Sequence, residues 1–199
     1  MKMYFYYGAM GSSKTANALM TRFNFEDKGK RVILMKPSID TRDGAEIVKS
    51  RAGLQAKAVL IEPDSKIRDV LPKSADYYDN IIVDEAQFLS KEQVDELREI
   101  VDQGTVVMCY GLKTDFRGLM FEGSKRLMEV ADSLREIVTM CYCGRKAIMN
   151  ARYIDNKIIY DGEQIYIGGD EAYISVCHQC YMRGTIDFKQ KNQVEDEEI

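Results

Sequence analysis

The chain has 199 residues, of which 45% are hydrophobic and 30% charged, and its formal net charge at pH 7 is -4. This length suits one full α/β domain with a small appendage. The acidic balance argues against a general binder of nucleic-acid backbones, and no apolar run reaches the roughly 18 residues that cross a membrane. The N-terminus lacks a signal-peptide pattern, so the five cysteines favour metal binding or free thiols over disulfides. We expect a cytoplasmic protein that binds neither membranes nor nucleic acid.

The first predicted elements are an apolar strand at residues 3–7 and a helix at residues 16–25. The turn between them consists of Gly8, Ala9, Met10, Gly11, Ser12, Ser13, Lys14 and Thr15. A strand, a glycine-bearing turn and Lys-Thr opening a helix are the context of a phosphate-binding P-loop. Backbone N–H groups and the helix dipole attract phosphate there, Lys14 reaches the terminal phosphates, and the Thr15 hydroxyl holds Mg²⁺.

Ser13 departs from this motif, because the pattern has glycine at its place. Its side chain would crowd the closest approach of phosphate. The alternative is a strand-to-helix turn that is merely capped by serine.

Residues 31–36 form an apolar run without alternation, which predicts a buried strand. Asp40 and Arg42 follow in a polar loop that runs to about residue 53, and a loop of this length is often functional. A short strand at residues 58–61 and a short helix at residues 67–71 come next.

Residues 80–84 predict another buried strand, which ends in Asp84 and is followed by Glu85. A carboxylate at the end of an apolar strand is the Walker B arrangement, which orients Mg²⁺. Glu85 then adds a carboxylate near the transferred phosphate, where a general base is needed.

Ser90 and Gln93 predict a capping box at the start of a helix. A buried strand at residues 105–110 and its exit loop at residues 111–118 follow. Beyond them, an apolar helical face is predicted at four positions, Leu127, Val130, Ala131 and Leu134.

Alternating strands and helices predict an α/β fold, a P-loop (RecA-like), mostly parallel sheet with helices on both faces. Ligands of such sheets bind at the carboxyl ends of the strands. The P-loop, Asp40–Arg42, Asp84-Glu85 and Asp115–Arg117 all follow predicted strands. We therefore expect them to converge on one edge.

The composition changes after residue 137, where two cysteine pairs appear. Cys141 and Cys143 are spaced C-x-C, and Cys177 and Cys180 are spaced C-x-x-C. Two such pairs indicate a tetrahedral structural zinc site, and the alternative is a set of reduced thiols. His178, the only histidine, could replace one cysteine as a ligand.

Six segments, in order, resemble the type II (cytosolic-type) thymidine kinases. They are residues 8–15, 36–42 (KPSIDTR), 83–88 (VDEAQF), 112–118 (LKTDFRG), 141–147 (CYCGRKA) and 167–180 (IGGDEAYISVCHQC). The resemblance implies transfer of the γ-phosphoryl group of ATP, with Mg²⁺, to the 5′-hydroxyl of thymidine, giving dTMP and ADP in nucleotide salvage for DNA synthesis. It also implies a homotetramer that dTTP inhibits, with deoxyuridine as an alternative acceptor.

The resemblance implies Glu85 as the general base, and we assign Lys14 a catalytic role beside it. We assign ATP binding to residues 8–15 of the P-loop and to Asp40, Arg42, Asp84, Glu85, Ala86 and Gln87. The family's nucleoside site corresponds to Phe88 and Phe116 and to a lasso loop at about residues 163–174, with contacts at Gln164, Ile165, Tyr166, Ile167, Gly168 and Tyr173. The family's contact with the thymine methyl group lies near Met149 or Asn150.

We divide the chain into a P-loop nucleotide-binding domain at residues 1–137, a zinc-binding lasso domain at residues 138–187 and a disordered acidic tail at residues 188–199. Two rival functions stay open. The sequence DEAQ favours a RecA-like nucleic-acid-dependent ATPase, although such motors usually need a second RecA-like domain and basic strand contacts. Ser13 favours a non-enzymatic zinc and nucleotide-binding module.

Overall fold

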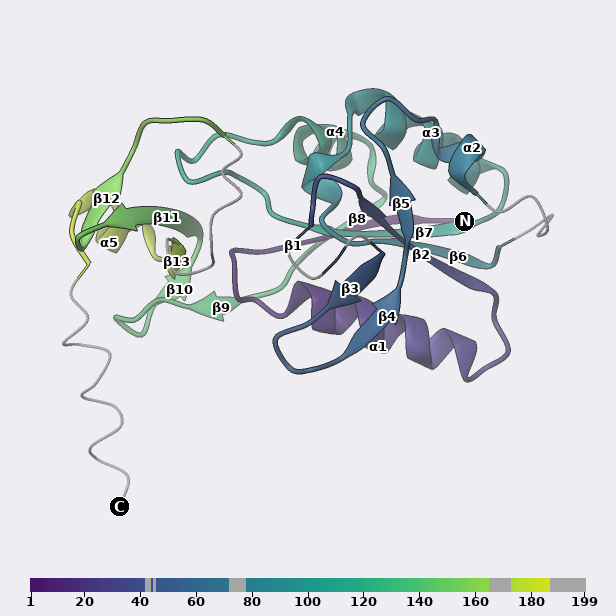
Figure 1. The fold of residues 1–199 in the computed structure, drawn as a ribbon, viewed down its shortest axis with the longest axis horizontal. Coiled ribbons are helices and arrows are strands. Elements are labelled where there is room, and N and C mark those ends of the chain that lie inside the picture. The colour runs from purple at the N-terminus through teal and green to yellow at the C-terminus, as the bar shows by residue number, and fades with distance from the viewer. Residues whose placement is uncertain (42–43, 45, 72–77, 165–172, 187–199) are drawn as a thin grey trace, which may run out of the picture. The chain divides into compact units, whose positions relative to one another are not determined.

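The computed structural model describes residues 1–41, 44, 46–71, 78–164 and 173–186 (Figure 1). The chain forms two compact units. The first consists of Met1–Tyr7, Ser13–Lys113 and Phe121–Glu136, and the second of Gly8–Ser12, Thr114–Met120 and Ile137–Ile199. The P-loop turn is thus divided between the units, while the domain limits at residues 137 and 187 stay a prediction.

The first unit is built on a six-stranded sheet with the order β5-β2-β6-β7-β1-β8, in which every pairing is parallel. The strands are β1 (Met3–Tyr7), β2 (Val32–Pro37), β5 (Val59–Ile61), β6 (Asn80–Val83), β7 (Val106–Gly111) and β8 (Ser133–Glu136). Strand β7 separates β1, which leads into the P-loop, from β6, which leads into Asp84. The predicted parallel sheet is confirmed.

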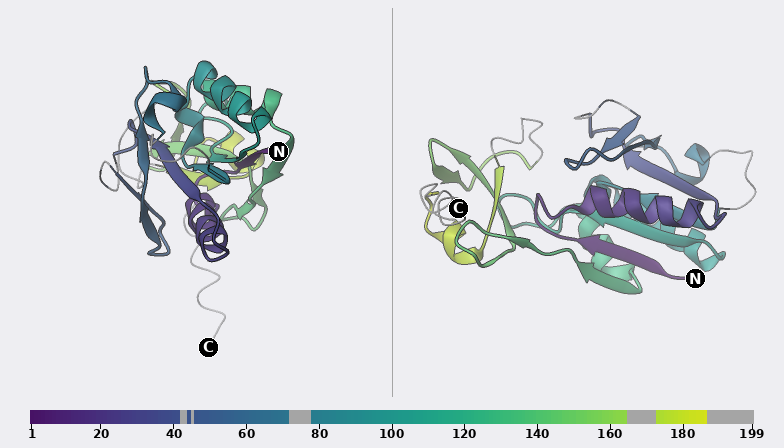
Figure 2. Two further views of the ribbon diagram at one scale, coloured as in Figure 1. Left: turned by 90° about the vertical axis from the view of Figure 1, so that its right-hand side faces the viewer. Right: turned by 90° about the horizontal axis from the view of Figure 1, so that it is seen from below.

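Helices cover both faces of this sheet, as predicted. Helix α1 (Lys14–Glu26) lies on one face, and α3 (Lys91–Asp102) and α4 (Glu122–Val130) lie on the other (Figures 1 and 2). The shorter elements are α2 (Ile67–Val70), the 3₁₀ turn η1 (Ala86–Phe88) and the hairpin of β3 (Ile47–Lys49) and β4 (Gln55–Lys57). None of the helices in the described ranges has the length and apolar character that crossing a bilayer requires.

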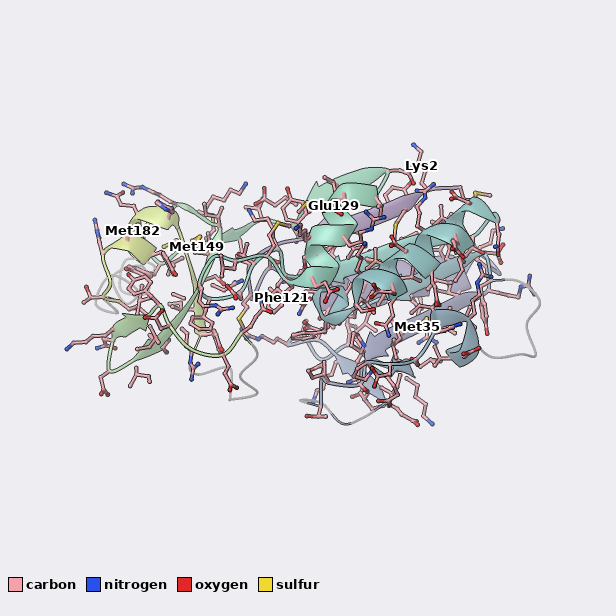
Figure 3. The ribbon with its side chains drawn as sticks, turned by 90° about the horizontal axis from the view of Figure 1, so that it is seen from above. Lys2, Met35, Phe121, Glu129, Met149 and Met182 are labelled. Atoms are coloured by element: carbon pink, nitrogen blue, oxygen red, sulfur yellow. The ribbon has the colours of Figure 1, made fainter. Side chains whose placement is uncertain are left out.

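The core between the sheet and its helices consists of apolar strand and helix residues, with Met35 of β2 fully buried (Figure 3). The central strands β6 and β7 are almost continuous apolar runs and are buried along nearly their whole length, because both of their faces are covered. The core includes Met3, Phe5, Ile33, Ile61, Ile81, Val83, Val94, Leu97, Val101, Val107 and Leu127.

Two local expectations were wrong. Leu134 does not extend the apolar face of α4, because that helix ends at Val130 and Leu134 lies in β8, opposite Phe5 of β1. The backbone hydrogen bonds to β1 decide the conformation there, and the Leu134 side chain stays 47% exposed. The loop after Asp40 also contains the short strand β3.

The second unit has its own small antiparallel sheet with the order β12-β11-β13. Its elements are β9 (Thr139–Met140), β10 (Lys146–Ala147), β11 (Met149–Ile154), β12 (Lys157–Ile159), β13 (Tyr173–Val176) and α5 (His178–Met182). Asp155 and Asn156, both with positive φ, form the tight turn between β11 and β12. A small core contains Ala151, Ile158, Val176, Tyr181 and Ile186 together with cysteines. The predicted tail at residues 188–199 lies outside the described residues.

Candidate active site

The P-loop turn joins β1 to α1 and has an unusual backbone. Gly11 has a φ of 70° and Ser13 a φ of 60°, both in the left-handed region that glycine tolerates best. At Gly8, an added Cβ would lie 2.3 Å from the carbonyl oxygen of Ile137, so only glycine fits. The P-loop motif has glycine at the position of Ser13, and the left-handed backbone there gives a second reason for that preference, beside the predicted crowding of the phosphate.

We predict that Ser13→Gly stabilises the chain by about 1 kcal/mol, because a left-handed residue other than glycine costs about 1–2 kcal/mol and glycine loses part of this gain in chain entropy. Urea unfolding measures the change. ATP affinity should stay equal or rise. Ser12→Gly is the matched control, since Ser12 is not among the residues with positive φ, and it should gain no stability. A loss of kinase activity in Ser13→Gly would show that the hydroxyl has a role of its own.

Two adjacent carboxylates, those of Asp84 and Glu85, directly follow strand β6 in the first unit. Asp84 is 4% exposed, and Glu85 follows it with a φ of 51°. Burial raises the pKa of Asp84 to about 7, and the adjacent Glu85 carboxylate acts in the same direction. A hydrogen bond from the Thr15 hydroxyl and the charge of Lys14 act in the opposite direction. The structure therefore brings Lys14 and Thr15 of the P-loop to the carboxylates that follow β6.

The turn after β6 is held rigidly by Gln87, which is 2% exposed. Its Nε2 donates to Glu85 Oε2 at 2.5 Å, and its Oε1 accepts from the backbone N–H of Leu112 at 3.0 Å. Two glycines permit this packing. A Cβ at Gly111 would lie 2.7 Å from Gln87 Oε1, and one at Gly123 would lie 2.7 Å from the carbonyl oxygen of Ala86. The Glu85 carboxylate is thus oriented by a buried amide.

Phe88 ends the same turn and contacts the Phe121 ring edge-to-face, with ring centroids 5.6 Å apart. Asp40 lies after β2, where its Oδ2 is 3.8 Å from Nζ of the fully buried Lys36. Lys36 also donates to the backbone carbonyl groups of Gly44 and Ile47, so it fixes the segment that carries Asp40. Sequence reasoning missed this lysine. Arg42 lies outside the described residues.

In the second unit, Asp115 and Phe116 occupy the loop at residues 114–120. Asp115 Oδ2 accepts from the Arg117 guanidinium at 2.8 and 3.0 Å and from Gln164 Nε2 at 3.1 Å. Phe116 is 2% exposed, and the guanidinium groups of Arg117 and Arg152 lie 5.8 and 5.6 Å from its ring centroid. These contacts fix Phe116 in place.

The predicted lasso loop is described only in part. Tyr173 lies at the start of β13 and Gln164 contacts Asp115. The other predicted contacts, Ile165, Tyr166, Ile167 and Gly168, lie outside the described residues.

The two cysteine pairs come together in the second unit. Sγ of Cys143 lies 3.5 Å from that of Cys141 and 3.7 Å from that of Cys177, and the four Sγ atoms, including that of Cys180, lie within 4.8 Å of one another. A disulfide would need about 2.05 Å, whereas four thiolates about 2.3 Å from one Zn²⁺ are about 3.8 Å apart. The cluster therefore fits a tetrahedral zinc ion. His178 is exposed at the start of α5, outside this cluster.

The model of the thymidine kinase family matches residues 1–181 of the chain. The chain belongs to the thymidine kinase family. It is 45% identical to the thymidine kinase of Streptococcus gordonii, over 94% of this chain and 98% of that protein. It is 44% identical to the thymidine kinase of Lactococcus lactis, over 93% and 99% of the two chains, and 45% identical to that of Vibrio vulnificus, over 90% and 96%.

Membership of the thymidine kinase family confirms the resemblance that the six segments indicated. Within the first unit, the predicted P-loop residues Lys14 and Thr15 meet the predicted Walker B residues Asp84 and Glu85. Asp115–Arg117 belong to the second unit, as do the turn residues Gly8–Ser12. The convergence of all four segments on one edge stays a prediction.

Proposed function

We propose that this chain is a thymidine kinase, which transfers the γ-phosphoryl group of ATP to the 5′-hydroxyl of thymidine and gives dTMP and ADP. The observation that carries the proposal is the meeting of Thr15 and Asp84 beside Lys14 and Glu85 in a member of this family. A lysine, a hydroxyl and two carboxylates at the ends of parallel strands are what phosphoryl transfer requires.

Each residue has a defined part in this reaction. The backbone N–H groups of the P-loop and Lys14 bind the phosphates, and Thr15 and Asp84 would hold Mg²⁺, which neutralises charge on the phosphates. Glu85 accepts the proton of the 5′-hydroxyl, and Gln87 keeps its carboxylate in one orientation. Asp40, Arg42 and Ala86 complete the ATP site.

The residues proposed for the nucleoside are Phe88, Phe116, Gln164 to Gly168 and Tyr173, as the family resemblance implies. Four cysteine thiolates hold a structural zinc ion in this proposal, and the geometry of the cluster supports it. The zinc would stabilise the unit to which the flanking strands β12 and β13 belong.

We also propose, as the family resemblance implies, that the chain forms a homotetramer in the cytoplasm and that dTTP inhibits it. Light scattering of the purified chain and a titration of kinase activity with dTTP test the assembly and the inhibition.

ADP production tests the function. We expect ADP release that depends on thymidine, with deoxyuridine as a second acceptor in the panel, and about one zinc per chain in the same sample. ADP release that depends on single-stranded DNA would instead support the ATPase. Nucleotide binding without production of ADP under any of these conditions would support the non-enzymatic module.

A further inference from the structure

Two side chains of the second unit hold both backbone groups of Met10 in the P-loop turn. Asn150 Oδ1 accepts from the Met10 N–H at 2.8 Å, and the Ser175 hydroxyl donates to the Met10 carbonyl oxygen. Asn150 lies in β11 and Ser175 in β13, and the two residues are directly opposite each other in the antiparallel pair. One cross-strand pair therefore forms a two-point clamp on a single peptide segment of the turn.

The other end of the Asn150 amide is also engaged. Its Nδ2 donates to the carbonyl oxygen of Thr114 at 2.9 Å, and the side chain is only 3% exposed. A buried amide that lost either partner would leave a polar group unsatisfied, which costs more than the average hydrogen bond contributes. Asn150 thus ties the turn at Gly8–Ser12 to the loop that carries Asp115 and Phe116.

Further contacts of the same turn come from the second unit as well. The Thr139 hydroxyl donates to the Gly11 carbonyl oxygen at 3.5 Å, and Gly8 packs against the carbonyl of Ile137. The conformation of the first half of the P-loop therefore depends on contacts made by β11, β13 and the segment at β9. A phosphate nest binds its anion only when its N–H groups are held in the right directions.

We propose that Asn150 and Ser175 are positioning residues for ATP, which act by fixing the backbone of Gly8–Ser12. The inference rests on the proposed function, because it takes this turn as the phosphate site. It assigns Asn150 to the ATP side of the reaction, whereas the family resemblance placed a contact with the thymine methyl group at Met149 or Asn150. The contact with the thymine methyl group stays a prediction for both Met149 and Asn150, which are neighbours in β11.

Ser175→Ala tests the clamp, because it removes one hydroxyl and leaves the strand intact. Calorimetric titration with ADP, without thymidine, should show about three- to tenfold weaker binding, the effect of one hydrogen bond. The KM for thymidine should stay within about twofold. Ser175→Thr keeps the hydroxyl on a side chain that suits a strand, and it should restore ADP binding. Asn150→Ala should weaken ADP binding more strongly.

Ile154→Ala is the matched control, since Ile154 lies in β11 but is 56% exposed, and it should leave ADP binding unchanged. Unchanged ADP binding in Ser175→Ala would overturn the inference. So would a rise in the thymidine KM alone, or equal losses for both substrates with a lower melting temperature. If the unaltered chain bound no ADP, the proposed function would fail as well, whereas ADP binding that survives Ser175→Ala refutes only the clamp.

Discussion

Glu85→Gln should lower the turnover number for thymidine phosphorylation by about 10²–10⁴-fold, the usual contribution of a general base. The amide has the shape of the carboxylate but cannot take the proton of the 5′-hydroxyl. Gln87 Nε2, which donates to Glu85 Oε2 at 2.5 Å, can donate equally to the carbonyl oxygen of the new amide. We therefore expect the turn to keep its conformation, and ADP affinity to stay within about twofold.

Steady-state kinetics and ADP calorimetry on the same preparation separate these two effects. Glu99→Gln is the matched control, because Glu99 of α3 forms only an exposed ion pair with Arg68 of α2 and the substitution makes the same change of charge. It should leave turnover unaltered. Should Glu85→Gln turn over at the normal rate, another group must accept the proton.

The parts of the fold that depend on neighbouring residues could be predicted from the sequence. The capping box at Ser90 and Gln93 is present in full, with the Gln93 N–H donating to Ser90 Oγ at 3.2 Å and the Ser90 N–H to Gln93 Oε1 at 3.1 Å. Strand β6 was also predicted, because burial on both faces produces a continuous apolar run. In both cases the signal lies within a few residues of the structure that it specifies.

The features that depend on distant residues could not be predicted. Leu134 fits a helical pattern, yet pairing with β1, about 130 residues earlier in the chain, makes it part of a strand. The Met10 clamp joins positions that are 140 and 165 residues apart, and no spacing rule connects them. Ser13 was visible as a departure from the motif, but its left-handed backbone is a property of the folded turn.

Cys177→Ser should release zinc and abolish kinase activity. Structural zinc contributes about 10–16 kcal/mol to the folding of small zinc domains, and a serine hydroxyl does not replace a thiolate ligand. Cys177 joins β13 to α5 and accepts the N–H of Cys180 at 3.5 Å, so its loss also opens the turn between the last two ligands. We expect zinc content to fall from about one per chain to less than a tenth, and the second unit to become sensitive to protease.

Cys109→Ser is the control for this change, because Cys109 is the one cysteine outside the cluster and lies fully buried in β7. It should destabilise the first unit by about 1–3 kcal/mol through the buried hydroxyl, while zinc content stays at one per chain. His178→Ala should also retain zinc, since His178 is exposed outside the cluster. Zinc retained in Cys177→Ser but lost in His178→Ala would place the histidine in the ligand set. A tetrahedral site needs four donors, and His178 would then be the fourth beside the three cysteines other than Cys177.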